Sequence, residues 1–275
     1  MDMNVGQNRD VKTVLKDVLS TASDREITFL AAGFAYFAFV SLFPMVLLAL
    51  VAGSFIGGER VAERLVVIAG DFLPDAGEDL LLEVLTTEAG RAEATVLALG
   101  VSTWGALKVF RGLSLAFDQV YDTVPDDSLV EQLRDALTVF LSVILALLLM
   151  IVLGGVIGMA AGEIPMGWLL GWLALLGGLV LVFLPMYYVL PPIAISLREA
   201  TPGAVFAAFG WVLLQLGFQV YVANAGQYEA YGAIGAILLF VTWLYFAGIL
   251  ILLGTVINVV LGRHDHTKEA ASDAE

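Results

Sequence analysis

The stretch AYGAIGAILLFVTWLYFAGILILLGTVINVVLG, residues 230–262, decides the fold of this chain, because it runs for 33 residues without a single charge. An α-helix rises about 1.5 Å per residue, so roughly 20 residues cross the hydrocarbon core of a bilayer, which is about 30 Å thick. The stretch therefore predicts a transmembrane helix with room for tilt.

Five further uncharged runs lie upstream of it, at residues 27–58, 94–107, 136–162, 164–197 and 200–228. The run at 94–107 is short, but it continues past Lys108 and Arg111, whose long side chains can reach the membrane surface. We predict six transmembrane helices. No stretch shows sustained period-2 alternation, and an open sheet cannot satisfy its backbone in lipid. The expected fold class is therefore all-α, a polytopic membrane bundle.

The composition supports this fold. Hydrophobic residues make up 60% of the 275 residues, charged residues make up 15%, and the mean hydropathy is +0.91. A typical soluble domain is about 45–50% apolar and about 25% charged. These values argue against a soluble enzyme.

The basic residues predict the orientation. With six spans both termini lie on one side, and ten of the thirteen basic residues fall there. These ten are Arg9, Lys12, Lys16, Arg25, Lys108, Arg111, Arg134, Arg198, Arg263 and Lys268, against Arg60, Arg64 and Arg91 on the other side. Under the positive-inside rule, both termini are expected in the cytoplasm of a multi-pass plasma- or inner-membrane protein.

The chain has three polar segments: two flank the transmembrane domain at 27–262, and the third is a loop within it. Residues 1–26 form a cytoplasmic segment with apolar residues at helical spacing, which indicates an amphipathic helix that either lies on the membrane interface or packs on the bundle. Residues 58–93 form an external acidic loop with two short helices, and residues 263–275 form a polar tail.

The charge of the chain limits its partners. The net charge of −14 and the isoelectric point near 4.4 leave no basic surface for nucleic acid. The carboxylates of the 58–93 loop lack the spacing of a calcium loop, so we interpret them as solvated surface. An acidic, lysine-poor exterior is typical of proteins from salty habitats.

No catalytic or cofactor motif is present. The chain has no cysteine, and its two histidines, His264 and His266, lie in the polar tail. No phosphate-binding glycine loop or nucleophile elbow appears in the sequence. We expect no enzyme activity, no metal and no cofactor.

Glycines predict how two helices pack. Gly154, Gly158 and Gly162 are four residues apart on the third span, and Gly167 and Gly171 repeat the spacing on the fourth. Small residues at this spacing let helix backbones approach closely. We expect an antiparallel hairpin of the third and fourth spans, and a homo-oligomer interface on the third span remains the alternative.

Prolines mark bends and ends of helices. Pro185 lies inside the fourth span, and Thr201-Pro202 is a suitable N-cap and first residue for the fifth. We therefore predict that the fifth helix begins at this pair.

Polar residues at membrane depth are the candidate functional residues, because they are energetically unfavourable there. Gln215 and Gln219 are one turn apart on the fifth span, so they share a face. We expect them to turn inward toward Tyr36 and Ser41 of the first span, with Asn258 closing the cytoplasmic end. The face is either a polar pathway or a set of hydrogen bonds that hold helices together.

Three motifs resemble a known family. The segment Phe34-Ala-Tyr-Phe-Ala-Phe-Val-Ser-Leu-Phe-Pro44 is followed by Arg111-Gly-Leu-Ser-Leu-Ala-Phe-Asp-Gln-Val-Tyr121. The C-terminal motif has three parts, Tyr228-Glu-Ala-Tyr231-Gly232-Ala-Ile-Gly235, Trp243-Leu-Tyr245 and Leu253-Gly254-Thr-Val-Ile-Asn258. In order and spacing these are similar to the motifs of the YihY/virulence factor BrkB family.

The resemblance implies a six-span membrane protein. Members of that family have carried the name ribonuclease BN, but this sequence shows neither the metal-holding groups nor the basic groove that RNA hydrolysis requires, so we reject that interpretation. The last motif usually contains a glutamate where this chain has Val256, which argues against a role for that acid here.

Two function classes stay open at this point. One is a transporter or permease for a lipid-like or small solute, with the lipid bilayer as its surroundings. The other is a membrane scaffold or envelope-maintenance protein that transports nothing.

Overall fold

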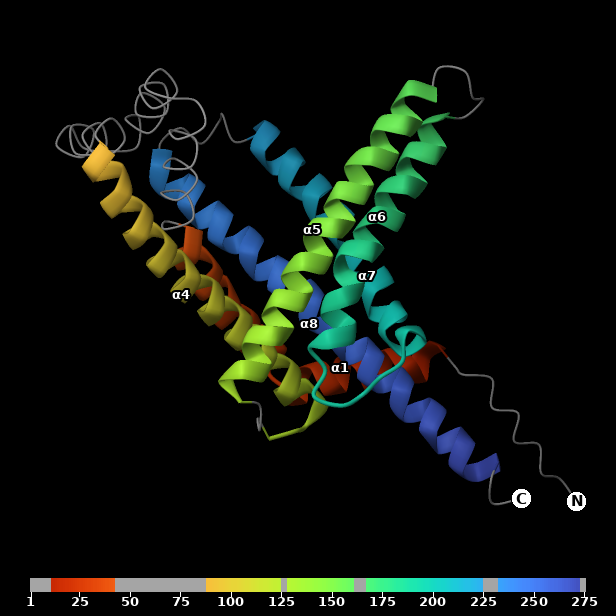
Figure 1. The fold of residues 1–275 in the computed structure, drawn as a ribbon. Coiled ribbons are helices and arrows are strands. Elements are labelled where there is room, and N and C mark those ends of the chain that lie inside the picture. Colours follow the sequence, from red (N-terminus) through yellow and green to blue (C-terminus); the bar gives the residue numbers. More distant parts are fainter. Residues whose placement is uncertain (1–10, 43–87, 125–127, 161–166, 225–231, 273–275) are drawn as a thin grey trace, which may run out of the picture. The chain divides into compact units, whose positions relative to one another are not determined.

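The structure, a computed structural model, describes residues 11–42, 88–124, 128–160, 167–224 and 232–272. Within these ranges the chain forms helices and turns and contains no strand. The helices, shown in Figure 1, are α1 (Val11–Asp24), α4 (Glu88–Tyr121), α5 (Leu129–Ala160), α6 (Gly167–Val189), α7 (Leu197–Asn224) and α8 (Gly232–Ser272), and an unlabelled helix over Ile27–Leu42 follows α1. The predicted all-α polytopic membrane bundle is confirmed.

Among the residues that the structure describes, five helices are long and apolar enough to cross a membrane. They do so over Thr95–Tyr121, Val130–Val152, Gly171–Val189, Leu197–Tyr221 and Ile237–Gly262. A sixth span is added if α1 and the helix over Ile27–Leu42, which are bent by 60° at Arg25 and Glu26, are counted together. Pro44 and the remainder of the first predicted span lie outside the described residues.

The chain divides into two compact units. One comprises Met1–Ala35 and Arg111–Glu275, and we call it the core unit. The other comprises Tyr36–Phe110. The core unit holds α1, the last turns of α4, and all of α5 to α8.

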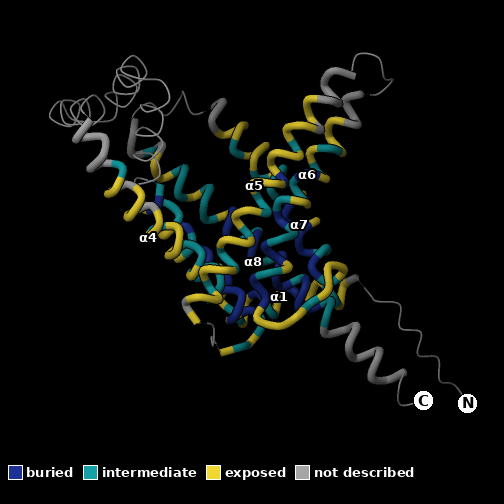
Figure 2. Tube along the Cα trace, viewed as in Figure 1, coloured by how far each residue is buried: buried dark blue, intermediate teal, exposed yellow. Residues whose placement is uncertain are grey.

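Within the core unit, helices adjacent in sequence pack against one another. α5 packs on α6, α6 on α7 and α7 on α8, while α1 lies against α8. Figure 2 shows the buried residues gathered where α1, α6, α7 and α8 meet. Much of this contact is made by small side chains, since Ala200, Ala204, Ala207 and Ala208 of α7 are all buried. Small residues allow the helix axes to approach closely.

Large apolar side chains cover the outside of the bundle. On α5, Leu141, Leu145, Leu148 and Ile151 are all exposed, although none carries a polar atom in its side chain. An apolar surface of this extent is unfavourable in water and favourable against lipid tails. It accords with a multi-pass membrane protein.

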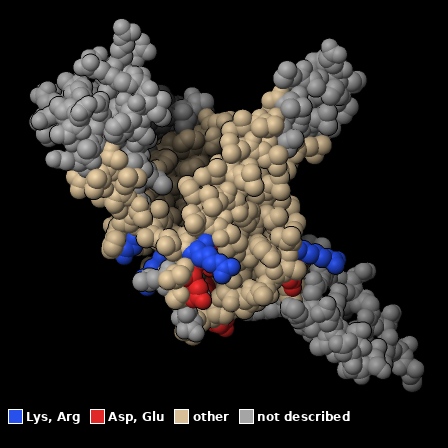
Figure 3. Space-filling model, viewed as in Figure 1, with Lys and Arg blue, Asp and Glu red and all other residues tan. Residues whose placement is uncertain are grey.

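The described charged side chains gather at one end of the core unit, which we call the charged end (Figure 3). It is formed by α1, the part of α4 from Arg111 to Tyr121, and the first turns of α5 and α7. The surface beyond it in Figure 3 is uncharged where it is described.

Two capping boxes start helices at the charged end. In α5 the Ser128 hydroxyl and backbone N–H both donate to Glu131, each at 2.8 Å, and in α7 the Ser196 hydroxyl and N–H donate to Glu199 at 2.8 and 2.6 Å. The prediction that the fifth span begins at Thr201-Pro202 is therefore wrong. The box satisfies the first backbone donors five residues earlier, and the helix continues through Pro202.

The N-terminal amphipathic helix is confirmed as α1. Val18 and Ala22 are buried on the side that packs, whereas Leu15 and Leu19 are exposed. One row of the apolar stripe thus packs on α8, as one alternative predicted, and contact of the exposed row with the membrane interface stays a prediction.

Two predicted polar segments contribute residues to helices of the bundle. α8 continues into the predicted polar tail at 263–275 as far as Ser272, since the tail contains neither proline nor glycine after Gly262. The last residues of the acidic loop at 58–93, from Glu88 on, belong to α4. The rest of that loop lies outside the described residues.

The helix pair α5 and α6 packs together as expected, and two of the five predicted glycines, Gly154 and Gly171, have no neighbour at the contact. A Cβ on Gly154 or Gly171 would meet nothing within 4 Å, whereas one on Gly178 would lie 2.6 Å from the Met150 sulfur. The two helices of the hairpin are therefore in contact at Gly178 of α6, against which the Met150 side chain of α5 packs. The surroundings of Gly158 and Gly167, and all of Gly162, lie outside the described residues.

Candidate functional site in the core unit

Asn258 fastens α8 to α7 near the charged end. Its side-chain oxygen accepts a hydrogen bond from the Gly203 N–H at 2.6 Å, and its amide nitrogen donates to the Ala200 carbonyl at 3.2 Å. All three residues are buried. Since both ends of the amide are paired with one turn of α7, Asn258 acts here as a clamp between two helices.

The clamp depends on two glycines. A Cβ on Gly203 would lie 2.5 Å from the Gly254 carbonyl oxygen, and one on Gly254 would lie 2.9 Å from the Gly203 oxygen and 2.7 Å from Tyr187 Cζ. Backbone atoms cannot yield in the way that flexible side chains can. The two helices therefore cross at a distance that only glycine allows.

Tyr187 of α6 completes this crossing. Its hydroxyl donates to the Ile251 carbonyl at 2.8 Å, and the same carbonyl accepts from the Thr255 hydroxyl at 3.3 Å. The tyrosine ring lies 6.0 Å from the ring of Phe117, in the last turns of α4. We call Tyr187, Gly203, Gly254 and Asn258 the glycine crossing. It closes the core unit near the charged end with paired polar atoms.

Val256 lies in the same part of α8 and is fully buried, with 0% of its surface exposed. This is the position at which the family motif named in the sequence analysis usually has a glutamate. An ionised carboxylate here would need a compensating partner inside the core. The valine fills the position with apolar volume and needs none.

Gln215 and Gln219 lie on a continuation of the buried face of α7. A helix has 3.6 residues per turn, so Ala204, Ala208, Trp211, Gln215 and Gln219 form one stripe. Ala204 and Ala208 are 0% and 1% exposed, whereas both glutamines are exposed. The stripe is therefore covered by protein near the charged end and uncovered in its second half.

A different stripe of α7 is suited to lipid. Five large apolar residues, all exposed, follow one another about a third of a turn away from the glutamines; they are Val205, Phe209, Leu213, Leu216 and Val220. Every member of this stripe is apolar. The glutamines are thus exposed, but on the side of the helix that faces inward where the bundle is closed.

The face of α7 that meets α8 also becomes less covered with distance from the charged end. Gly203, Gly210 and Gly217 recur every seven residues. A Cβ would lie 2.5 Å from Gly254 at the first position and 2.6 Å from Leu250 at the second, and would meet nothing at the third. The contact between α7 and α8 is thus tight near the charged end and open around Gly217.

An aromatic cluster lies where this contact ends. Trp243 of α8 has its ring 5.2 Å from Trp211, 6.1 Å from Phe218 and 6.0 Å from Phe240, and Trp211 lies 5.6 Å from Phe183 of α6. The Trp243 indole nitrogen is shielded from solvent and has no hydrogen-bond partner in the described part of the chain. Buried tryptophan N–H groups usually find an acceptor.

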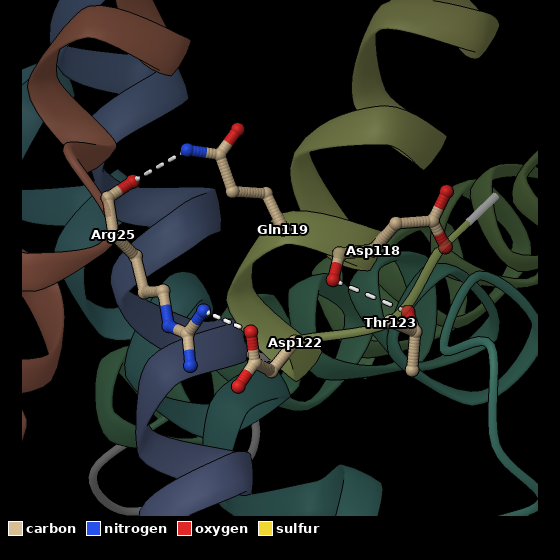
Figure 4. Close-up of polar contacts among 5 residues, drawn as sticks. All are labelled: Arg25, Asp118, Gln119, Asp122 and Thr123. Carbon is tan, nitrogen blue, oxygen red and sulfur yellow. Dashed lines mark hydrogen bonds and ion pairs between the residues drawn. The ribbon is translucent and has the colours of Figure 1, made fainter.

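A second polar group joins the base of two helices at the charged end (Figure 4). Arg25 forms an ion pair with Asp122 at 2.5 Å, and Gln119 donates from its side-chain amide to the Arg25 carbonyl at 3.4 Å. The hydrogen bond from the guanidinium to the Asp122 carboxylate raises the pKa of Arg25. We call Arg25, Gln119 and Asp122 the clasp.

The backbone at the clasp has two unusual residues. Glu26 and Asp122 have φ angles of 50° and 65°, in the left-handed region that non-glycine residues seldom adopt. At Asp122 the reason is a Schellman ending of α4, in which the Asp122 and Thr123 N–H groups donate to the Gln119 and Asp118 carbonyls. The clasp therefore joins two points where helices end and the chain turns sharply.

Within the core unit, Asn258 does not join the glutamines. Asn258 contacts Gly203, which lies twelve residues, or about 18 Å along the helix, from Gln215. Ser41 donates to the Phe37 carbonyl of its own helix at 2.6 Å and approaches Gly105. Tyr36 is exposed. Both belong to the Tyr36–Phe110 unit.

The residues of the sequence motifs fall at several places in the structure. Gly254, Asn258 and Trp243 belong to the groups described above, and Tyr245 is partly buried on α8. Arg111 is exposed and Tyr121 ends α4 at the charged end. Gly232 and Gly235 lie in the first turn of α8. Pro44, Tyr228 and Tyr231 lie outside the described residues.

Sequence analysis missed three features of this site. Tyr187 gave no signal, because a tyrosine near the end of a span is ordinary. The clasp joins residues 97 positions apart, which no local pattern shows. The seven-residue spacing of Gly203, Gly210 and Gly217 is visible in the sequence and could have indicated the tight face of α7.

Comparison with known proteins identifies the family of this chain. The model of a family described as virulence factor BrkB matches residues 18–275. The chain belongs to the BrkB family. The match begins at Val18, in the middle of α1, and includes every span described above.

Individual relatives match shorter segments. The putative ribonuclease-like protein YfkH of Bacillus subtilis is 43% identical over 86 residues, 31% of each chain. The UPF0761 membrane protein PSHAa0171 of Pseudoalteromonas translucida is 37% identical over 73 residues, 26% of this chain and 24% of the relative. The UPF0761 membrane protein VP0125 of Vibrio parahaemolyticus is 33% identical over 101 residues, which are 36% of this chain and 32% of the relative. The aligned segments thus span about a third or less of each relative. No solved structure matches this chain significantly.

Metal binding is not indicated in the region that the structure describes. No group of three or more histidine, aspartate or glutamate side chains there is placed to hold an ion. The site is therefore one of amides, aromatic rings and close-packed glycines.

Proposed function

We propose that this BrkB family member is a transporter or permease for a lipid-like or small solute, and that Gln215 and Gln219 line the outer part of its path. The charge bias between loops supports a plasma- or inner-membrane location with both termini in the cytoplasm, so that the charged end is cytoplasmic. The glycine crossing then closes the cytoplasmic half.

The observation that carries this proposal is the change along one stripe of α7. The stripe is buried at Ala204 and Ala208 and exposed at Gln215 and Gln219, while the separate exposed stripe is entirely apolar. An amide facing hydrocarbon without a partner is unfavourable by several kcal/mol. An inward-facing amide with no cover among the described residues is instead stable against water or a polar ligand.

The name ribonuclease-like belongs to YfkH and is not carried over. Binding RNA requires basic groups that neutralise phosphates, and this chain has a net charge of −14. We propose a function other than catalysis.

The second candidate is a membrane scaffold. The close-packed glycine crossing favours it, since a rigid, fully paired crossing suits a protein that holds a shape. In that case the two glutamines would pair with another copy of the chain.

Flux measurements separate the two candidates. The protein is reconstituted in vesicles, and two probes are followed, namely transbilayer movement of fluorescent NBD-phosphatidylglycerol and entry of glycerol. We expect the wild type to accelerate one of them, and Gln219→Leu to reduce that rate at least tenfold without lowering the unfolding temperature. Val220→Leu, on the apolar stripe, is the matched control and should transport normally.

Rates equal to those of protein-free vesicles for both probes would contradict transport. A normal rate in Gln219→Leu would contradict the assigned path. If Gln219→Leu instead lost stability by about 0.6–2 kcal/mol, the range for interhelical hydrogen bonds, the scaffold would be supported.

A further inference from the structure

The unpaired indole nitrogen of Trp243 is the starting point. It is shielded from solvent, and no acceptor is within reach among the described residues. A buried donor without a partner destabilises a protein by about 1–3 kcal/mol. The ring itself is well packed, with Trp211, Phe218 and Phe240 around it. Its N–H, in contrast, has no hydrogen-bond acceptor among the described residues.

Trp243 lies beside the glutamine stripe. Gln215 follows Trp211 by four residues and precedes Phe218 by three, and the rings of both contact Trp243. Gln215 is six residues from the end of its span at Tyr221, and Trp243 is six residues from the start of its own at Ile237. Both therefore lie about 9 Å inside the same end of their spans.

The surroundings are open on this side. Gly217 lies on the face of α7 that meets α8 nearer the charged end, and a Cβ added to it would have nothing within 4 Å. Phe218 and Phe240 beside Trp243 are only partly buried. The rings that flank Trp243 are therefore themselves partly accessible.

The charge of the neighbourhood limits the ligand. No lysine, arginine, aspartate or glutamate occurs in residues 200–228 or 230–262. An ionised group at this depth would have no countercharge on α7 or α8. The ligand therefore has to be uncharged where it meets Trp243, and it has to present an acceptor oxygen.

We propose that Trp243 and Gln215 form a binding site for an uncharged amphiphile with a carbonyl group, such as a diacylglycerol. The indole N–H donates to the carbonyl oxygen, the Gln215 amide binds the polar end, and the aromatic cluster contacts the apolar part. The inference rests on the proposed function, since it names the class of solute for the glutamine-lined path.

Binding to the full-length protein in detergent tests the site, with native mass spectrometry as the readout. The probes are 1,2-dioleoylglycerol and its dialkyl ether analogue, whose ether oxygens are weaker acceptors. We expect the wild type to prefer the ester. Trp243→Phe keeps the aromatic ring and removes the N–H, so it should weaken binding of the ester about five- to tenfold, the loss of one hydrogen bond. Trp172→Phe makes the same chemical change at an exposed position of α6 outside the aromatic cluster and should bind within twofold of the wild type.

Thermal unfolding without added lipid gives an independent readout. Trp243→Phe and Trp211→Phe remove the same ring volume from the same cluster. If the Trp243 N–H is unpaired in the empty protein, Trp243→Phe should therefore unfold no lower than Trp211→Phe. A lower unfolding temperature than that of Trp211→Phe would show that the N–H already has a partner within the chain, and it would overturn the proposal. Equal binding of the ester to wild type and Trp243→Phe would overturn it as well. Neither result would affect the flux test with Gln219→Leu, so the two proposals can fail separately.

Discussion

Replacing glycine by alanine at Gly203 and at Gly217 should change the stability of the protein in opposite directions. In a helix, alanine is favoured over glycine by about 0.8–1 kcal/mol. At Gly217 the new methyl group meets nothing within 4 Å, so Gly217→Ala should gain most of this amount. At Gly203 it would lie 2.5 Å from the Gly254 oxygen and 2.6 Å from the Asn258 amide nitrogen.

The expected penalty at Gly203 follows from these distances. Overpacking a tight contact is unfavourable by about 1–3 kcal/mol, and losing the Asn258 pairing adds about 1 kcal/mol. After the helix preference is subtracted, Gly203→Ala should be destabilised by about 1–3 kcal/mol. The magnitude is large because the atoms in the way belong to backbone and to a residue held by two hydrogen bonds.

Thermal unfolding in detergent, followed by tryptophan fluorescence, measures both variants. For a chain of this size, 1 kcal/mol corresponds to about 2–4 °C in the unfolding temperature. We expect Gly217→Ala to unfold at or above the wild-type temperature, and Gly203→Ala several degrees below it. Equal shifts in the two variants, or a more stable Gly203→Ala, would refute the glycine crossing.

Further predictions concern the polar contacts. A double-mutant cycle with Arg25→Ala and Asp122→Asn should give a coupling of about 0.2–1 kcal/mol that shrinks in high salt, because the pair is partly exposed; a coupling of zero at low salt would remove the clasp from the account. Tyr187→Phe should lower the free energy of unfolding by about 0.5–1.5 kcal/mol through loss of one buried hydrogen bond, and an unchanged value would show that Ile251 is satisfied without it.

The transmembrane helices were predictable because their signal is physical and local. Uncharged runs of spanning length have few alternatives in a bilayer, and each of the five described spans falls in a predicted run or extends one. Helix ends were less certain. The start of α7 was placed at Pro202, although Ser196 and Glu199 already carry the capping-box pattern that begins it at Leu197.

Helix contacts were predicted less well than helices. The spacing of Gly154 and Gly171 suggested close approach, yet both face open space, because spacing shows which residues share a face and not what the face meets. Asn258 was correctly singled out as unusual at its depth, but its pairing with the α7 backbone depends on a crossing that only three-dimensional structure shows.

The glutamine stripe was predictable in part, less well than the helices and better than the helix contacts. That Gln215 and Gln219 share a face follows from their spacing alone. That this face continues the buried Ala204–Ala208 stripe, and lies apart from the apolar stripe, required the burial of each residue along α7. Their role as a path remains a proposal.

Reaction of single cysteines with a membrane-impermeant thiol reagent tests that proposal most directly. The chain contains no cysteine, so each variant carries one reactive group without further changes. Gln215→Cys and Gln219→Cys sample the glutamine stripe, and Leu216→Cys and Val220→Cys sample the apolar stripe at the same depth. If the stripe lines a water-filled path, the two glutamine positions should react in intact cells and the two apolar positions should not. Reaction at none of the four, or equally at all of them, would contradict the account.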